Sequence, residues 1–386
     1  MRTLYRNAAV AEARGPDLVL GQSALVVGRT IEYLGPDEDA PSPPPGCRVV
    51  DAGGATIVPG LVDAHSHTVL PGGSHWIERV GDHTGELLRV AEDNGELAFR
   101  AGIRWLRDVG SPRRDDKALA IRVRDDWVGR DDRPAIRAAG TWIAKTGYIA
   151  GLSIQAADGD ALQAAVEEQI ADGADLVKLY LDGPDPDVAP FTAAEVDRAV
   201  AAAHASDVRV TAHATNLAGA RSGVHGGVDC IEHGSELDMD LAAEMASRGT
   251  YVVPTLAILD SWGTFGATTT LERFTSAEGV ARLAARRETA VASLELARDA
   301  GVKIAAGTDF GGGSLRANQL AWEVEALARA GLEPWRALAA ATWVGGELLG
   351  ESDAGRIRPG GPADFFLVHG DPLSDPAALW RVWMVA

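Results

Sequence analysis

Residues 55–67 read Ala-Thr-Ile-Val-Pro-Gly-Leu-Val-Asp-Ala-His-Ser-His, an apolar run that ends in two histidines. The apolar part, residues 57–62, predicts a buried strand that is entered through a Pro-Gly pair. Because side chains alternate between the two faces of a strand, His65 and His67 point the same way. Two imidazoles side by side at a strand end can hold one divalent metal ion, which then needs further ligands from elsewhere in the chain.

Further candidate ligands stand at the ends of other predicted strands. The full set of candidate metal ligands is His65, His67, Lys178, His213, His233 and Asp309. Taken singly, His213 and His233 could each be a core histidine, but their places at successive strand ends favour a role as ligands. Asp309 could also exchange a proton with bound water, so it is the predicted catalytic residue.

Lys178 lies in an apolar strand, where a lysine is costly unless it is neutralised or paired. One interpretation is a buried ion pair with Asp175 or Asp182. The other is a lysine of lowered pKa that reacts with carbon dioxide. The resulting carbamate is an anion with two oxygens and can bridge two metal ions. The residues alone leave both interpretations open.

Between residues 56 and 350, strand-like runs alternate with helical ones. The predicted strands cover residues 57–62, 103–109, 135–139, 176–181, 208–212, 228–232, 250–253 and 302–306. Eight such units predict an α/β fold, a (β/α)8 TIM barrel, with its active site at the C-terminal ends of the strands. Two long connections, residues 69–99 and 260–279, are expected to form lids or binding loops.

The two ends of the chain have a different character, with short strand-like runs separated by glycine and proline. Neither end carries enough strands for a stable sheet of its own. The prediction is therefore one composite β-sandwich domain from residues 1–55 and 351–386, beside a catalytic barrel at residues 56–350.

Composition narrows the class of protein. The 386 residues carry 36 basic and 55 acidic side chains, a formal net charge of −19, which disfavours nucleic acid and anionic membranes as partners. Two cysteines are too few for a disulfide framework. The sequence shows neither a signal-peptide pattern nor a long apolar run. We therefore expect a cytoplasmic protein that acts on a small-molecule substrate and could form a homo-oligomer.

Several motifs together resemble the amidohydrolase superfamily over essentially the whole chain. They are Pro-Gly-Leu-Val-Asp-Ala-His-Ser-His at 59–67, Arg-Asp-Val-Gly at 107–110, Val-Lys at 177–178, Ala-His-Ala at 212–214, Ile-Glu-His-Gly at 231–234, Gly-Thr-Asp at 307–309 and Pro-Ala-Asp at 362–364. The most similar branch is that of the zinc prolidases and imidazolonepropionase-like dipeptidases, which have a (β/α)8 barrel with a small β-sandwich.

The resemblance also implies a binuclear metal centre, most simply two Zn2+ ions, although manganese, cobalt or iron would suit the same ligands. One ion would be held by His65, His67 and Asp309. The other would be held by two more histidines, His213 and His233. A carboxylated Lys178 and a hydroxide would bridge the two ions. The hydroxide would attack the carbonyl of a dipeptide, an N-acyl amino acid or a related small amide, and Asp309 would pass its proton to the leaving amine.

In one loop the chain departs from the branch, which usually places a substrate-binding histidine after the third strand. Residues 145–151 read Lys-Thr-Gly-Tyr-Ile-Ala-Gly and contain no histidine. Tyr148 could donate a hydrogen bond in its place. Tyr180 lies two residues beyond Lys178 and could face the metals or simply pack. His75, in the long connection at residues 69–99, is a further candidate for substrate contact.

Other functions compete with amide hydrolysis. A cyclic amide, ester or carbamate hydrolase would use the same centre. A deaminase with one metal ion would need a glutamate near His213, where Ala214, Thr215 and Asn216 stand instead. A non-enzymatic relative would be expected to have lost ligands, and all six candidates are present.

Overall fold

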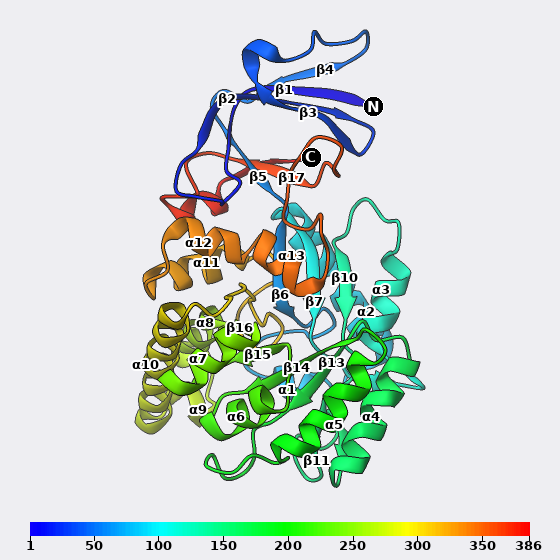
Figure 1. Ribbon diagram of the computed structural model, residues 1–386, viewed down its shortest axis with the longest axis vertical. Coiled ribbons are helices and arrows are strands. Elements are labelled where there is room, and N and C mark those ends of the chain that lie inside the picture. Colours follow the sequence, from blue (N-terminus) through cyan, green and yellow to red (C-terminus); the bar gives the residue numbers. More distant parts are fainter.

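The computed structural model describes residues 1–386. Figure 1 shows a sheet at one end of the molecule, where both chain termini lie, and a larger α/β region that holds the remaining strands and most helices.

Both ends of the chain contribute to one seven-stranded sheet with the order β18-β17-β5-β1-β2-β3 and with β4 paired to β1. Its strands are β1 (Arg2–Val10), β2 (Val19–Val27), β3 (Thr30–Pro36), β4 (Arg48–Asp51), β5 (Thr56–Pro59), β17 (Phe365–Val368) and β18 (Val382–Val385). The two ends therefore share a sheet, as expected. The strand pairing gives a single sheet, so it does not confirm the two layers of a sandwich.

The predicted strand at residues 57–62 is divided at Gly60. Its first part, β5, pairs with β1 and β17 in the terminal sheet, whereas β6 (Leu61–Ser66) pairs with a strand of the α/β region. Glycine suits the junction because a Cβ at residue 60 would lie 2.3 Å from Cγ of Arg104. The strand that carries His65 therefore begins at Leu61.

The α/β region contains a three-stranded parallel sheet, β10-β7-β6, and a six-stranded sheet, β12-β11-β13-β14-β15-β16. The further strands are β7 (Ile103–Asp108), β10 (Ala135–Ala138), β11 (Ile143–Lys145), β12 (Ile154–Ala156), β13 (Leu176–Tyr180), β14 (Arg209–Ala214), β15 (Cys230–His233) and β16 (Tyr251–Val253). A separate hairpin joins β8 (Arg113–Arg114) to β9 (Lys117–Ala118). These strands match seven of the predicted runs, with ends shifted by one or two residues, or by four at β6.

Single bridges connect the two sheets. Ala139 pairs with Leu176 on one side, and the segment after Gly301 pairs with β16 and β6 on the other, through Ile304 and Phe310. The eighth predicted strand, residues 302–306, exists only as the bridge at Ile304. The chain then passes so close to β6 that a Cβ on Gly307 would lie 2.5 Å from Cβ of His65.

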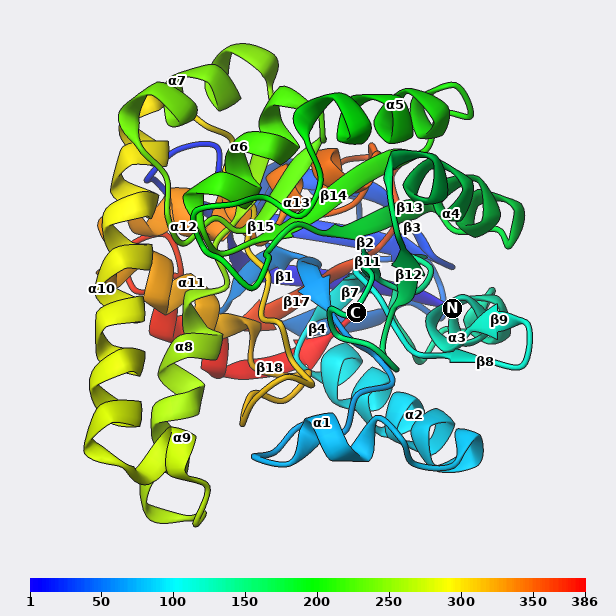
Figure 2. The ribbon, with the colours of Figure 1, turned by 90° about the horizontal axis from the view of Figure 1, so that it is seen from below.

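Helices surround the parallel strands (Figure 2). They are α1 (Trp76–Arg79), α2 (Thr84–Arg100), α3 (Leu119–Trp127), α4 (Gly159–Ala171), α5 (Ala193–His204), α6 (Leu217–His225), α7 (Met239–Arg248), α8 (Leu256–Gly263), α9 (Glu272–Thr275), α10 (Ala277–Ala300), α11 (Leu320–Arg329), α12 (Pro334–Ala340) and α13 (Trp343–Leu349). A capping box formed by Thr192 and Glu195 starts α5. Both long connections contain helices: α1 and α2 lie in the first, and α8, α9 and the start of α10 lie in the second.

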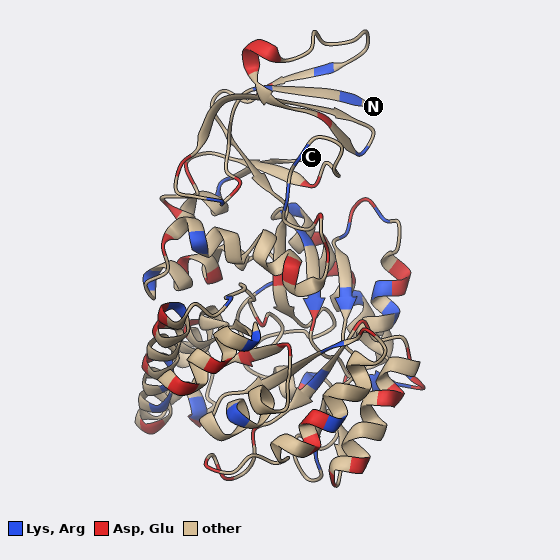
Figure 3. Ribbon diagram, viewed as in Figure 1, with Lys and Arg blue, Asp and Glu red and all other residues tan.

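Charged residues of both signs are interspersed along the outer helices (Figure 3). The net charge of the chain is therefore spread over the surface. None of the helices is both long and apolar enough to span a bilayer.

Candidate metal centre

Six side chains that the sequence singled out line one cavity of about 1280 Å³. They are His65 and His67 from the end of β6, Lys178 from β13, His213 from β14, His233 from β15 and Asp309 from the segment after residue 301. The cavity lies at the C-terminal ends of the parallel strands, where the fold was expected to place an active site. The structure therefore brings all six candidates together.

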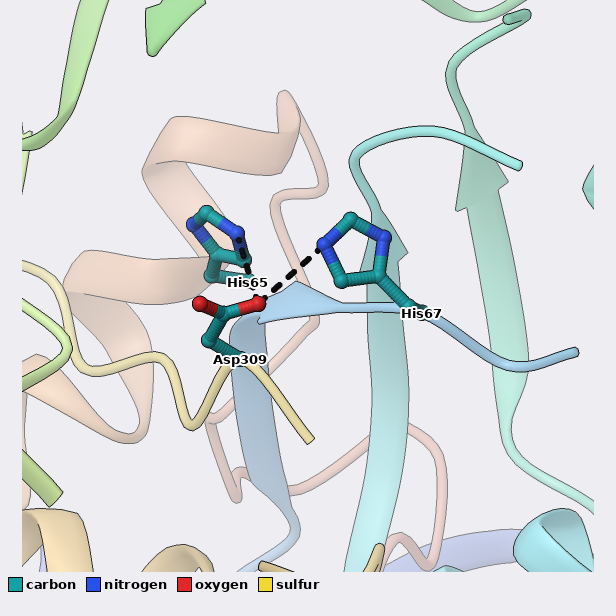
Figure 4. Close-up of side chains that lie close together, drawn as sticks. All are labelled: His65, His67 and Asp309. Carbon is teal, nitrogen blue, oxygen red and sulfur yellow. Dashed lines mark ion pairs between the residues drawn. The ribbon is translucent and has the colours of Figure 1, made fainter. Parts of the chain in front are cut away.

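Three of them form the tightest group (Figure 4). Oδ1 of Asp309 lies 3.4 Å from Nε2 of His65 and 3.2 Å from Nε2 of His67. The three potential ligand atoms lie within 4.8 Å of one another. One metal ion could contact all three after small movements of these side chains.

The other two histidines stand beside this group. The ring of His233 lies 5.0 Å from the ring of His65 and 4.6 Å from the ring of His213, measured between centroids. The four imidazoles thus form a continuous cluster.

Each of the four rings has one nitrogen hydrogen-bonded to a neighbouring oxygen. The pairs are His65 Nδ1 with Glu232 at 2.7 Å, His67 Nδ1 with the Gly110 carbonyl at 2.8 Å, His213 Nε2 with Asp182 at 3.0 Å and His233 Nδ1 with Thr255 Oγ1 at 2.8 Å. Metal-bound histidines in proteins show this arrangement, because the outer hydrogen bond fixes the tautomer and leaves the other nitrogen free to bind. The donor set therefore fits a metal centre.

Lys178 supplies an independent test of that fit. Its side chain is buried, and its Nζ has no hydrogen-bond partner. The two acids that could have paired with Lys178 have other partners: Asp175 pairs with two arginines, and Asp182 bonds His213. The ion-pair interpretation is therefore wrong. Burial lowers the pKa of Lys178 to about 8, which favours the neutral amine that carbon dioxide can modify.

Two of the candidate ligands have an unusual backbone. His233 has φ of 70° and Asp309 has φ of 56°, both in the left-handed region that residues other than glycine rarely adopt. Thr255, the partner of the His233 ring, has φ of 50°. Strain of this kind persists where the surrounding structure enforces it, and it clusters at functional sites.

Glu232 and Arg107 are site residues that sequence reasoning missed. Glu232 is fully buried and bonds the ring of His65, while Arg107 lies 2.6 Å from its other oxygen. Burial alone would raise the pKa of Glu232, but Arg107, Lys178 and His65 hold it well below its ordinary value. The signal was present in the sequence, since Glu232 is a charged residue inside an apolar strand, as Lys178 is.

The candidate substrate contacts divide into two groups. Tyr148 and Tyr180 both line the cavity, and the Tyr180 ring stacks on His213 with centroids 4.1 Å apart. His75 does not line the cavity. It precedes α1 with its side chain 57% exposed and near Glu78, so its proposed role in substrate contact is not supported.

Two further cavity residues come from the second long connection, which contains Trp262, and from the helix that follows it, which carries Arg286. Arg286 of α10 lies over the ring of Trp262 of α8, with its Cζ 5.4 Å from the ring centroid. Arg286 has no carboxylate partner within ion-pair distance. Sequence reasoning expected a lid in this region but gave no reason to select this arginine among several on the same helix.

Comparison with known proteins tests the family resemblance of the sequence motifs. The family model described as "Amidohydrolase family" matches residues 56–385. An uncharacterized protein of Mycobacterium bovis is 35% identical over 342 residues, 84% of this chain and 82% of that protein. The imidazolonepropionase of Salinispora arenicola is 28% identical over 90% of this chain and 85% of its own length. The crystal structure of a Xaa-Pro dipeptidase with bound methionine covers 100% of this chain and 98% of its own, at 26% identity and a TM-score of 0.84. The chain is therefore a hydrolase that belongs to the amidohydrolase family.

Proposed function

We propose that this hydrolase cleaves the C–N bond of a small amide, of the dipeptide or N-acyl amino acid class, with two divalent metal ions. The observation that carries the proposal is the convergence of four histidines, Asp309 and an unpartnered buried Lys178 on one cavity. Family membership supports amide hydrolysis in general, and the similarity to a dipeptidase supports the narrower substrate class.

The division of ligands follows from which side chains lie together. His65, His67 and Asp309 would hold one ion, because their ligand atoms already form a group. His213 and His233 would hold the other. Lys178, once carboxylated, would offer an oxygen to each ion. Imidazole and carboxylate ligands suit zinc, so zinc is the proposed metal.

Bound divalent ions would lower the pKa of a water molecule and polarise the amide carbonyl. Asp309 would accept a proton from that water and return it to the leaving amine. Burial would raise the pKa of Asp309, but His65 and His67 hold it well below its ordinary value, so Asp309 is in the ionised form that a proton acceptor requires.

Other residues that line the cavity would bind the rest of the substrate. Arg286 offers an uncompensated positive charge beside Trp262, and the two tyrosines add hydroxyl groups. A guanidinium with no protein carboxylate is well suited to the free carboxylate of a dipeptide or N-acyl amino acid. Trp142, whose ring lies 5.5 Å from the ring of His67, would cover an apolar acyl group.

A cyclic amide is the second candidate. It is favoured by the similarity to the Salinispora imidazolonepropionase, which extends over most of both chains. The same centre would act on an ester or a carbamate, so the substrate class has to be measured directly.

The scaffold proposed for this chemistry is a (β/α)8 barrel at about residues 56–350, beside a β-sandwich domain from residues 1–55 and 351–386. The bridges from Ile304 to β16 and from Phe310 to β6 support closure of the ring of strands.

The test is a hydrolysis screen of the zinc-loaded protein with dipeptides, N-acyl amino acids, their C-terminal amides, lactams and esters. We expect turnover of substrates with a free carboxylate, and two zinc ions per chain by elemental analysis. Turnover restricted to lactams would select the second candidate. A fully loaded protein that releases ammonia from an amidine-type base and hydrolyses none of these substrates would overturn the proposal.

A further inference from the structure

Thr255 stands at the N-cap of α8 but does not cap the helix with its own side chain. A threonine at this position usually accepts a hydrogen bond from the backbone N–H of the second or third helical residue. Here its Oγ1 bonds Nδ1 of His233 at 2.8 Å instead. The hydroxyl that would normally stabilise the start of α8 is used to orient a candidate metal ligand.

A residue far away in the sequence takes over the capping. The backbone N–H groups of Leu256 and Ala257 donate to the two carboxyl oxygens of Glu323, at 3.0 and 2.7 Å. Glu323 lies on α11 and is fully buried. These two groups are the first of the N–H donors that a helix start leaves without intrahelical partners.

The backbone conformation of Thr255 explains why the start of α8 needs the cap from Glu323, which we call the clamp between α11 and α8. Its φ of 50° is left-handed, a conformation that is particularly costly for a β-branched residue. If α8 could shift, Thr255 would relax to an ordinary N-cap conformation and its hydroxyl would turn toward its own helix. Glu323 prevents this because it satisfies one of those donors, the N–H of Ala257, and fixes the first turn of α8.

We infer that Glu323 is a positioning residue for His233: by capping α8 it holds Thr255 in the conformation that orients the His233 imidazole toward the metal centre. The link runs from α11 through the start of α8 to the end of β15. The inference goes beyond the proposed reaction and rests on that proposal only for the identity of the group that His233 faces.

The position of His233 makes the expected effect selective. His233 belongs to the half of the centre that contains His213, whereas His65, His67 and Asp309 form the other half. Loss of the clamp should therefore weaken one of the two metal sites. Outer hydrogen bonds to a metal-bound histidine are typically worth about 10–100-fold in metal affinity, which sets the size of the expected loss.

The experiment compares Glu323→Ala and Thr255→Val with wild type by zinc titration of the metal-free protein. Both variants should bind the first ion as wild type does and the second about 10–100-fold more weakly. Thr255→Ser restores the hydroxyl and should recover the second site. Asp158→Ala removes the N-cap of α4, where Asp158 accepts from the Ala161 N–H at 2.9 Å. This control should lose stability without a change in either affinity.

A second measurement needs no metal. Long-range 1H–15N spectra of the metal-free protein should show His233 protonated at Nδ1 in wild type and a mixture of tautomers in Glu323→Ala and Thr255→Val. Glu323→Gln keeps one acceptor oxygen and provides a milder variant if Glu323→Ala does not fold.

The outcomes separate this inference from the proposed function. If wild type binds no metal, the proposed function fails while the ring spectra still decide the role of Glu323. If the Glu323 variants lose stability but keep both zinc affinities and the wild-type His233 tautomer, Glu323 is only a helix cap and the inference is overturned. A loss in Thr255→Val alone would also overturn it.

Discussion

The four candidate histidines of this cavity are oriented by hydrogen bonds to other parts of the protein. Each histidine has one nitrogen held by an oxygen that comes from a different strand, loop or helix. The site therefore depends on buried acceptors such as Glu232 as much as on the ligands themselves. Two residue-scale predictions follow from the geometry around Asp309 and Lys178.

Asp309 lies between the nitrogens of His65 and His67, and its low pKa keeps it ionised. Asp309→Asn keeps the size of the side chain and removes its ability to accept a proton. We expect kcat to fall about 10²–10⁴-fold, as for other positioned acid–base groups, with a much smaller change in KM. Steady-state kinetics on protein with its metal content measured would check this. Near-normal turnover at full metal content would contradict the assigned role.

The Nζ atom of Lys178 has no hydrogen-bond partner inside the protein. We therefore expect metal binding to depend on carboxylation of this lysine more than on the length of its side chain. Lys178→Ala should lose one or both metal ions and most activity. A short carboxylic acid added with zinc should partly restore both, because it can supply the two oxygens of the missing carbamate. Lys178→Met provides a control of similar length, which should lose metal equally but respond less to the added acid. Full zinc binding by Lys178→Met would rule out a lysine-derived ligand.

At the scale of elements, the junction at Gly60 separates the terminal sheet from the strand that carries the first two ligands. A Cβ at residue 60 would meet Cγ of Arg104 at 2.3 Å and the Asp364 carbonyl at 3.1 Å. Gly60→Ala should therefore destabilise the protein by roughly 1–3 kcal/mol, as overpacking generally does.

Chemical denaturation measures this cost, with Gly15→Ala as the matched control. No atom lies within 4 Å of a Cβ at residue 15, so that variant should be nearly neutral. Equal stability of the two variants would show that the junction tolerates a side chain and that its backbone path is not set by close packing.

The clamp between α11 and α8 gives a pH-dependent prediction at the same scale. Burial raises the pKa of Glu323 to about 8, although the two backbone N–H groups oppose the shift. An unfolded glutamate titrates near about 4.3. Between these values the folded chain holds a proton that the unfolded chain has released, so stability falls as pH rises from about 4.5 through 8.

Glu323→Gln cannot titrate and should not show this loss. Thermal unfolding of both proteins at several pH values, with metal content held constant, should give a stability difference that moves in favour of the variant as pH rises. Curves that stay parallel over this range would show that Glu323 does not titrate there.

At the scale of the whole molecule, the sequence predicts what is local and repeated. The six candidate ligands can be selected from the sequence because each ends or interrupts an apolar strand, and the capping box at Thr192 marks its helix without tertiary information. The Pro-Gly pair at residues 59–60 is visible in the sequence, but only the strand pairing shows that it divides the run between two different sheets.

Contacts between distant segments could not be predicted in this way. Glu323 reaches α8 across 67 residues of sequence separation, and nothing in its own helix distinguishes it from other glutamates. The residue type of His75 suggests a substrate contact, but this residue does not line the cavity, although Trp76 and Ile77 of the adjoining α1 do. Arg286 was not chosen, because only the packing of α10 against α8 turns it toward the site.

Arg286 also provides the prediction that tests the cavity as a whole. Its guanidinium lies on α10, its aromatic neighbour lies on α8, and both line the same cavity as the candidate ligands. If this charge binds a substrate carboxylate, Arg286→Met should raise KM for a dipeptide or N-acyl amino acid. The loss of a charged hydrogen-bonding partner predicts an increase of roughly 10–100-fold.

The C-terminal amide of the same substrate isolates that charge. The amide has no carboxylate, so wild type and Arg286→Met should handle it with similar KM, while kcat should change little for either substrate. Arg287, the next residue on the helix, already pairs with Asp260. Arg287→Met therefore controls for the loss of one positive charge from α10 and should leave the preference for the carboxylate unchanged. An equal loss with acid and amide substrates would mean that Arg286 shapes the cavity wall without recognising the carboxylate.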